Sequence, residues 1–579
     1  SILYDEVLQL SDNDYGIKKI KIKLILVTGE VLLSQTLLKL VPKKSGLTYN
    51  INADDSISLS GVNLYWWYNK NCDDHKIRKP LILIEGFDPL NTLSQKVVFK
   101  KYGGEDFGLL NGIYGDLDKI KLSEYLHDDD YDVFYIDYKE GHIAIQHNAY
   151  YVTQAIQWIN ERKHKDGSFE KNIVIGASMG GVVGYYALKS MENQGNDHEA
   201  EFFLSVDSPL KGANIPIGMQ AFIQELGDYK LAGFKLRDLG KDNGLSRGAF
   251  ALNSPAAKQL LYYHYASSSW SDCSGIDGDC TETFANNLSS VHDAFYSELE
   301  ALGTLNIKHY SISNGSILRK EQQFDIGAKL ADAYITTDEL LDEVLPLGPI
   351  WDASEYLFIK GLRTGFFSKH IVHSLNTSGK HRVYYGGFGQ VILNIPIVKI
   401  IERHVKDALP YDSAPGGMRI FEKGLSWNFE SFCFIPTISS LKLNTTDPYY
   451  NDINNLDDVE KTIASGITSV NYYSGSYERK PFFDKGNLFW NEDHVSLNKR
   501  LAEFLRLLVG YKTIHVNNPL DSRTFNFGDQ DVTIDDLTNN RKTRIRNVIN
   551  YDLDITNSGK LIANKYVKIG YTYDPNLAL

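Results

Sequence analysis

The chain has 579 residues, which is more than one ordinary hydrophobic core accommodates and implies roughly two to four domains. Its apolar content of 43% and charged content of 23% are typical of a globular protein, and no apolar run is long enough to cross a membrane. The net charge of −13 argues against a nucleic-acid partner, because phosphate binding requires a basic surface.

Residues 1–78 contain short segments in which apolar and polar residues alternate, such as KIKIKLILV (19–27) and ISLSGVNLYWWY (57–68). Alternation with a period of two predicts strands that have one buried face. We therefore expect an N-terminal β-rich region over residues 1–78.

From residue 79 the pattern changes to continuous apolar runs. These runs are LILIE (81–85), YDVFYIDY (131–138), NIVIGAS (172–178) and EFFLSVD (201–207). A strand that is buried on both faces has this composition, and residues 148–163 between two of the runs have helical spacing. The alternation of buried strands and amphipathic helices predicts an α/β fold with a parallel, doubly wound sheet over residues 79–510.

The run that ends at residue 178 continues as GASMGG, and a helical pattern follows at once. Gly176-Ala177-Ser178-Met179-Gly180 matches G-x-S-x-G, the strand-to-helix turn that exposes a nucleophilic serine above a sheet. The motif alone is weak, but the buried strand before it and the helix after it are the context that it requires. Ser178 is therefore the candidate nucleophile.

An oxyanion intermediate requires two backbone N–H groups that point at the developing charge. One is expected from Met179, which follows the nucleophile. The other is expected from the loop that follows the early strand LILIE, where Phe87 is the candidate donor in EGFDP.

Residues 210–305 form a long insertion with helical texture, in the position of a cap or lid. Cys273 and Cys280 bracket the loop CSGIDGDC within this insertion. Their spacing predicts a short disulfide, which would suit an oxidising compartment, although two free thiols remain the alternative. The acidic clusters DCSGIDGDC, HDDD and NNLDD lack the spacing of a calcium loop, so we expect no metal site.

A serine nucleophile requires a base, because its hydroxyl group is a poor nucleophile at neutral pH. His494 lies in NEDHV, directly before an amphipathic helix predicted over residues 496–508. Farther upstream, IKHYSISNGS (307–316) and SFCFIPTISSL (431–441) are predicted as further strands of the domain.

On EGFDP, GASMGG, VDSPLKGA and NEDH, the sequence resembles the lipase and esterase branch of the α/β-hydrolase superfamily, of the secreted bacterial type. The resemblance covers roughly residues 79–510 and implies that the histidine of the triad comes last in the chain. It also implies an acid near IPTISSL, but Phe432 occupies that position. Some lipases place the acid after the strand that follows the nucleophile strand, which makes Asp207 the first choice. Asp412 and Glu430 are the alternatives.

Residues 511–579 alternate again and predict a C-terminal β module, with the first coils of a truncated β-solenoid as a further interpretation. The chain starts at Ser1 and stops after strand-like sequence, so we expect it to derive from a longer polypeptide.

These features predict a secreted or surface-bound serine esterase or lipase that needs no cofactor. Its substrate would be an ester of a lipid or an acylated glycan. Acyl transfer to an alcohol would use the same residues. The alternative from another class is an inactive hydrolase-fold scaffold, which would bind partners in a surface assembly through its terminal β regions.

Overall fold

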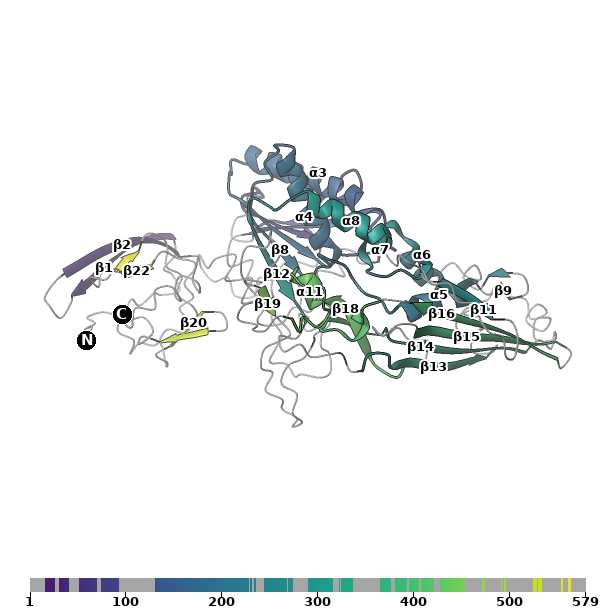
Figure 1. The fold of residues 1–579 in the computed structure, drawn as a ribbon. Coiled ribbons are helices and arrows are strands. Elements are labelled where there is room, and N and C mark those ends of the chain that lie inside the picture. The colour runs from purple at the N-terminus through teal and green to yellow at the C-terminus, as the bar shows by residue number, and fades with distance from the viewer. Residues whose placement is uncertain are drawn as a thin grey trace.

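The computed structural model describes only part of the chain (Figure 1). The described residues are 16–25, 31–40, 52–69, 74–92, 131–228, 230–231, 234–235, 244–267, 269–273, 290–315, 322, 324–336, 365–375, 381–392, 395–405, 408–420, 427–452, 471–473, 491, 494–495, 524–527, 530–533, 553–555 and 561–563.

Within these residues the central sheet has eight strands in the order β19-β12-β8-β7-β5-β6-β4-β3. The strands are β3 (Asp55–Ser58), β4 (Val62–Trp67), β5 (Pro80–Ile84), β6 (Asp132–Tyr138), β7 (Asn172–Ala177), β8 (Ala200–Val206), β12 (Lys308–Ser313) and β19 (Asn471–Tyr473). The strands from β19 to β6 are parallel, whereas β4 and β3 pair antiparallel at one edge. The prediction of a largely parallel central sheet is confirmed.

The sheet extends farther toward the N-terminus than the sequence indicated. Strands β3 and β4 lie upstream of residue 79, yet β4 pairs with β6 along its whole length. Val62, Leu64 and Trp66 alternate along β4 and are buried in the same cluster as the parallel strands. Their period of two suggested a separate β region, but β4 lies between β6 and β3 in the central sheet and places these three side chains in its core.

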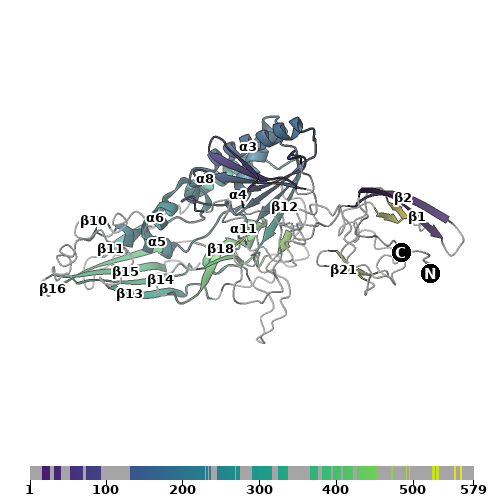
Figure 2. The ribbon, with the colours of Figure 1, turned by 180° about the vertical axis from the view of Figure 1, so that it is seen from behind.

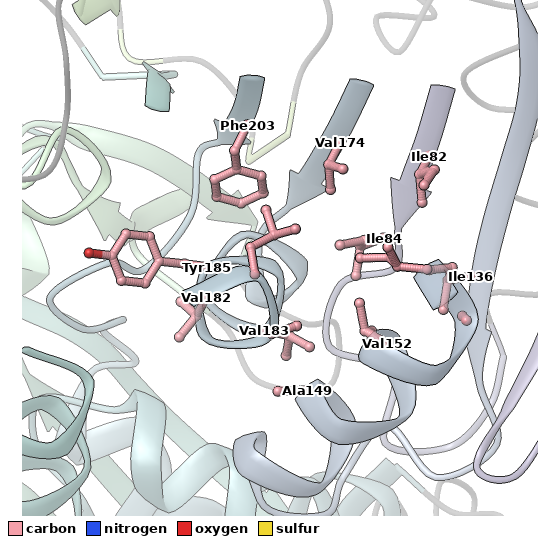
Figure 3. Packing of buried hydrophobic residues seen from close by; sticks show 14 of the residues in the cluster. Ile82, Ile84, Ile136, Ala149, Val152, Val174, Val182, Val183, Tyr185 and Phe203 are labelled. Atoms are coloured by element: carbon pink, nitrogen blue, oxygen red, sulfur yellow. The ribbon is translucent and has the colours of Figure 1, made fainter. Parts of the chain in front are cut away.

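Helices α3 (Ile145–Lys165) and α4 (Met179–Asn193) cover one face of the sheet. Figure 3 shows Val174 and Phe203 of the strands facing Val182 and Val183 of α4, with Val152 of α3 beside them. Helix α8 (Ser290–Ala301) adds Phe295, Tyr296 and Leu299 to the same cluster. This continuous apolar contact fixes the strands whose ends carry the candidate site.

A second sheet lies beside the first (Figure 2). In the described residues it has five antiparallel strands in the order β11-β16-β15-β14-β13. They are β11 (Ser269–Cys273), β13 (Lys329–Thr336), β14 (Gly365–His373), β15 (His381–Ile392) and β16 (Ile395–Val405). Helix α5 (Ile217–Asp228) packs on this sheet, where Phe222 contacts the His370 ring and Glu225 pairs with buried Arg403.

The insertion over residues 210–305 therefore does not form one helical cap. Helices α5, α6 (Gly244–Asn253) and α7 (Pro255–Leu260) are followed by β11, which joins the second sheet, and by α8, which packs on the central core. The strand predicted within residues 431–441 is present as β18 (Ser431–Pro436). It pairs with β17 (Gly416–Ile420) in a two-stranded sheet that is separate from the central sheet.

Nearer the two ends of the described chain, β1 (Gly16–Ile25) pairs with β2 (Val31–Leu40), β20 (Thr524–Phe527) with β21 (Gln530–Thr533), and β22 (Leu553–Ile555) with β23 (Leu561–Ala563). The helix predicted over residues 496–508 lies outside the described residues. Among the helices that are described, none has the length and apolarity needed to cross a membrane.

Candidate active site

The candidate site lies where the strand order of the central sheet changes direction. After β5 the chain moves to β6 on one side, and from β7 it continues to β8 and β12 on the other side. The loops that leave β5 and β7 therefore diverge at their carboxyl ends, which is where open α/β sheets place their ligands. Gly86 follows β5 and Ser178 follows β7, and a methyl group at Gly86 would lie 3.3 Å from Cβ of Ser178.

Ser178 occupies a strained turn between β7 and α4. Its backbone has φ 54° and ψ −128°, a region that residues with a side chain seldom adopt. The Ser178 N–H donates to Val206 O at 2.9 Å, which ties the turn to β8. Gly180 permits the turn, because a methyl group there would lie 2.4 Å from the carbonyl oxygens of Ile84 and Glu85. Strand, turn and helix thus have the arrangement that the motif predicts.

His494 lies against the serine. Its Nε2 atom is 2.7 Å from Ser178 Oγ. The His494 N–H donates to Met418 O of β17 at 2.8 Å, and the Phe434 ring packs edge-on against the imidazole with centroids 4.8 Å apart. A residue 316 positions away in the chain is therefore held beside Ser178 by the β17–β18 hairpin.

Asp207 completes a continuous chain of side chains. Its Oδ2 atom is 2.7 Å from His494 Nδ1, and its side chain is fully buried. Asp207 follows β8 directly and has a strained φ of 42°, and its Oδ1 atom accepts a hydrogen bond from the Asn314 N–H at 3.1 Å. Gly417 of β17 packs on this carboxylate, since a methyl group there would lie 1.9 Å from Oδ2.

The two alternative acids lie elsewhere. Asp412 is buried, with its oxygens accepting from Asn214 Nδ2 at 3.0 Å and from the Leu375 N–H at 2.8 Å, and burial raises its pKa to about 6. It joins the end of β14 to the loop after β8, which is a structural role. Glu430 is exposed, next to β18. The structure brings Asp207 to His494, and neither alternative.

The candidate oxyanion donors follow β5 and β7. Met179 is the first residue of α4 and is fully buried, and Phe87 is partly buried between the two main apolar clusters. Gly86, which precedes Phe87, contacts Ser178. Met179 lies at the N-terminus of α4, where partial positive charge accumulates, and Phe87 lies in the loop after β5, the strand beside β7.

Two acidic side chains lie behind the loop after β5. Burial, with Asp137 next to it, raises the pKa of Glu85 far above the usual range of a carboxyl group. Burial raises the pKa of Asp137 as well. The burial of Glu85 could not be predicted, because a strand end gives no local signal of how deeply its side chain is buried.

Sequence reasoning also missed the residues that hold the base and the acid, which are Asn314, Gly417, Met418, Phe434 and Asn491. Asn491 accepts a hydrogen bond from the Gly416 N–H at 3.0 Å and so fixes the segment that carries His494 to β17. The adjacent glycines 416 and 417 were the available signal. They lie in β17, and a methyl group on Gly417 would reach the Asp207 carboxylate.

Cys280 lies outside the described residues, so the disulfide predicted with Cys273 stays a prediction. Cys433 is a buried free thiol, whose pKa burial raises well above its usual value. In the described part of the chain, no group of histidine, cysteine and acidic side chains is arranged to hold a metal ion.

No protein-family model matches the sequence, and no curated protein matches it. Similar solved structures include Bacillus licheniformis lipase BlEst2 in mature form, at 13% identity and a TM-score of 0.24, covering 44% of this chain and 72% of that one. A Pyrobaculum calidifontis esterase matches at 11% identity and a TM-score of 0.21, covering 31% and 52%.

Brefeldin A esterase, a bacterial homologue of human hormone sensitive lipase, matches at 12% identity and a TM-score of 0.17, covering 36% of this chain and 44% of that one. The chain thus spans about half the length of these last two structures. The mixed α/β architecture with its largely parallel sheet is compatible with an α/β-hydrolase fold. At these TM-scores the similarity says nothing about activity.

Proposed function

We propose that this chain is a serine hydrolase that cleaves carboxylic esters on an α/β-hydrolase fold. One observation carries the proposal. Ser178 Oγ, His494 and Asp207 form a continuous series of 2.7 Å contacts at the carboxyl ends of adjacent parallel strands. A serine, an imidazole and a buried carboxylate in this order are the parts of an acyl-transfer triad.

In the proposed mechanism, the Ser178 hydroxyl oxygen attacks the ester carbonyl carbon while its proton moves to His494 Nε2. The carbonyl oxygen becomes an oxyanion, which the N–H groups of Met179 and Phe87 stabilise. When the tetrahedral intermediate collapses, the bond to the alcohol oxygen breaks, and that oxygen takes the proton from His494. Water then repeats the sequence on the acyl-enzyme and releases the acid.

Asp207 has two functions in this mechanism. By accepting the hydrogen bond from Nδ1–H it leaves Nε2 free to receive the serine proton, and its charge stabilises the imidazolium that forms. The buried position strengthens both effects, since the carboxylate is 0% exposed and is shielded from water. The second donor to it, the Asn314 N–H, keeps the carboxylate oriented.

An ester is proposed over a peptide because the motif segments around Ser178 and Asp207 resemble those of lipases and esterases. Acyl transfer to an alcohol remains compatible with the same residues. The further parts of the proposal are a secreted or cell-surface location, a hydrolase domain over residues 79–510 together with β3 and β4 of the central sheet, and terminal β regions that contact surface partners. The location and the surface partners rest on the sequence patterns alone.

A fluorophosphonate probe tests the proposal, because it reacts with activated serines. The full chain and Ser56→Ala, a control at an exposed position on β3, should be labelled, and Ser178→Ala should not. The unlabelled wild-type chain should hydrolyse p-nitrophenyl esters and lose this activity on labelling, and the dependence of the rate on acyl length separates an esterase from a lipase. If the folded wild-type chain is not labelled, the enzyme proposal fails and the scaffold alternative is favoured.

A further inference from the structure

Two carboxyl groups lie side by side directly behind the candidate oxyanion loop. Glu85 is the first residue after β5, and Asp137 lies in β6. Because Ile84 pairs with Ile136 in the parallel register, the two acids are the next neighbours across the strands. Glu85 is 3% exposed and Asp137 is 4% exposed.

Hydrogen bonding within this pair requires a proton. Glu85 Oε2 accepts from the Tyr138 N–H at 2.6 Å. Glu85 Oε1 and Asp137 Oδ1 are buried, and the described part of the chain offers them no N–H or O–H donor besides the opposite carboxyl group. Two carboxylate oxygens do not hydrogen-bond to each other unless one carries hydrogen, so a hydrogen bond within the pair requires one proton on one of the carboxyl groups.

The groups around the pair reinforce this conclusion. Asp88, Tyr135 and Tyr138 lie close enough to Glu85 to interact with it electrostatically, and Tyr65 interacts in the same way with Asp137. Asp88 adds negative charge, and the tyrosines are neutral hydroxyls whose pKa values burial raises further. Ionising both carboxyls of the pair would therefore add a second unsolvated charge next to an existing one.

The backbone of Glu85 connects the pair to the site. Its N–H donates to Ile136 O at 3.2 Å, and its carbonyl oxygen packs against Gly180 in the first turn of α4. The next residue, Gly86, contacts Ser178, and Phe87 follows. A shift of the Glu85 side chain would therefore move the N–H groups on which the proposed oxyanion hole depends.

We propose that Glu85 is a positioning residue that remains a neutral acid, donates its carboxyl proton to Asp137, and thereby holds Gly86 and Phe87 in place for oxyanion binding. The inference rests on the proposed function. It predicts an alkaline limit to activity. When the pair loses its proton, the hydrogen bond is lost and a second negative charge appears beside the position where the oxyanion develops.

Glu85→Gln and Glu85→Ala separate this role from simple packing. The glutamine amide still donates to Asp137 but cannot ionise, so Glu85→Gln should keep kcat within about threefold of wild type at pH 7 and lose the alkaline decline. Alanine removes the donor, so kcat should fall roughly 10²-fold, the scale of one lost oxyanion contact, with little change in KM. Glu161→Gln, on the exposed face of α3, is the matched control and should follow wild type.

The measurement is kcat/KM for a p-nitrophenyl ester from about pH 6 to about pH 10, with circular dichroism at each pH to confirm folding. If wild type is labelled by the fluorophosphonate but Glu85→Gln shows the same alkaline decline, the inference is wrong and the proposed function stands. Loss of activity in Glu85→Gln at neutral pH, with the fold retained, would also overturn it. Absence of labelling in wild type would overturn both.

Discussion

Replacing Asp207 by asparagine should nearly abolish catalysis without unfolding the protein. The side chain keeps its size and one of its two acceptor oxygens, and it loses the charge next to His494. We expect kcat/KM for a p-nitrophenyl ester to fall by about 10⁴, which corresponds to about 5 kcal/mol of transition-state stabilisation.

The magnitude follows from the two donors that face the carboxylate. Oδ1 accepts from the Asn314 N–H and Oδ2 accepts from His494 Nδ1. An asparagine that keeps its oxygen toward Asn314 must turn its NH₂ group toward Nδ1. The imidazole then carries its hydrogen on Nε2 and cannot accept the Ser178 proton.

The opposite amide orientation restores the productive imidazole but leaves two N–H groups facing each other at a fully buried position. An unmade hydrogen bond there costs about 1–3 kcal/mol, so this orientation is a minor population. Even that population lacks the negative charge that stabilises the imidazolium. Both orientations therefore lower the rate, and neither requires the backbone to move.

The assay is ester hydrolysis at neutral pH, with fluorophosphonate labelling as a second readout and circular dichroism to confirm folding. Glu430→Gln makes the same chemical change at an exposed alternative acid and should retain the wild-type rate. A folded Asp207→Asn variant with kcat/KM within about threefold of wild type would refute the assignment, since it would show that Asp207 does not set the state of His494.

Two further predictions follow from close contacts and burial. In Gly417→Ala the new methyl group would lie 1.9 Å from Asp207 Oδ2, so the carboxylate must shift and kcat/KM should fall about 10²-fold. In the control Gly248→Ala the methyl group has ordinary clearance, so this variant should retain activity. Equal activity of the two variants would contradict the contact between Gly417 and Asp207. Burial lowers the pKa of His370 to about 3, below its value in the unfolded chain, so the unfolded state takes up the proton first and stability falls as pH drops from about 6.5 toward 3. The free energy of unfolding should fall by at most about 5 kcal/mol over this range. It can be measured by urea unfolding at about pH 7 and about pH 4, and in His370→Gln the difference between the two pH values should be smaller. An unchanged difference would exclude His370 as its source.

The parallel sheet could be predicted because each of its strands carries the signal within itself. Strands such as β6 and β7 are buried almost throughout, so their sequences are continuous apolar runs. The turn at Ser178 was predictable for the same reason, since strand, glycines and helix are adjacent in the chain. Asp207 could also be predicted, because it comes directly after β8, the strand that follows the nucleophile strand in the chain.

The second sheet and the β17–β18 hairpin could not be predicted from such signals. Strand β11 pairs with β16, which lies more than a hundred residues later in the chain, and no local sequence pattern predicts that pairing. Gly416 and Gly417 resemble loop residues, because glycine is common in turns. Their close approach to Ile435 O and to Asp207 is a property of the folded chain, set by residues far away in the sequence.

The position of the acid has a physical explanation in the hairpin. Phe432, where the family resemblance implied a carboxylate, is buried in the apolar cluster that also contains Phe434 and Ile435. A carboxylate there would lose its hydration without a described partner, at a cost of several kcal/mol. Asp207 instead lies at the end of the strand next to β7, with its N–H bonded to Ile312 O, while the Ser178 N–H bonds to Val206 O. Serine and acid are thereby fixed by neighbouring strands, so only the histidine must be placed from a distance, and β18 packs the Phe434 ring against it.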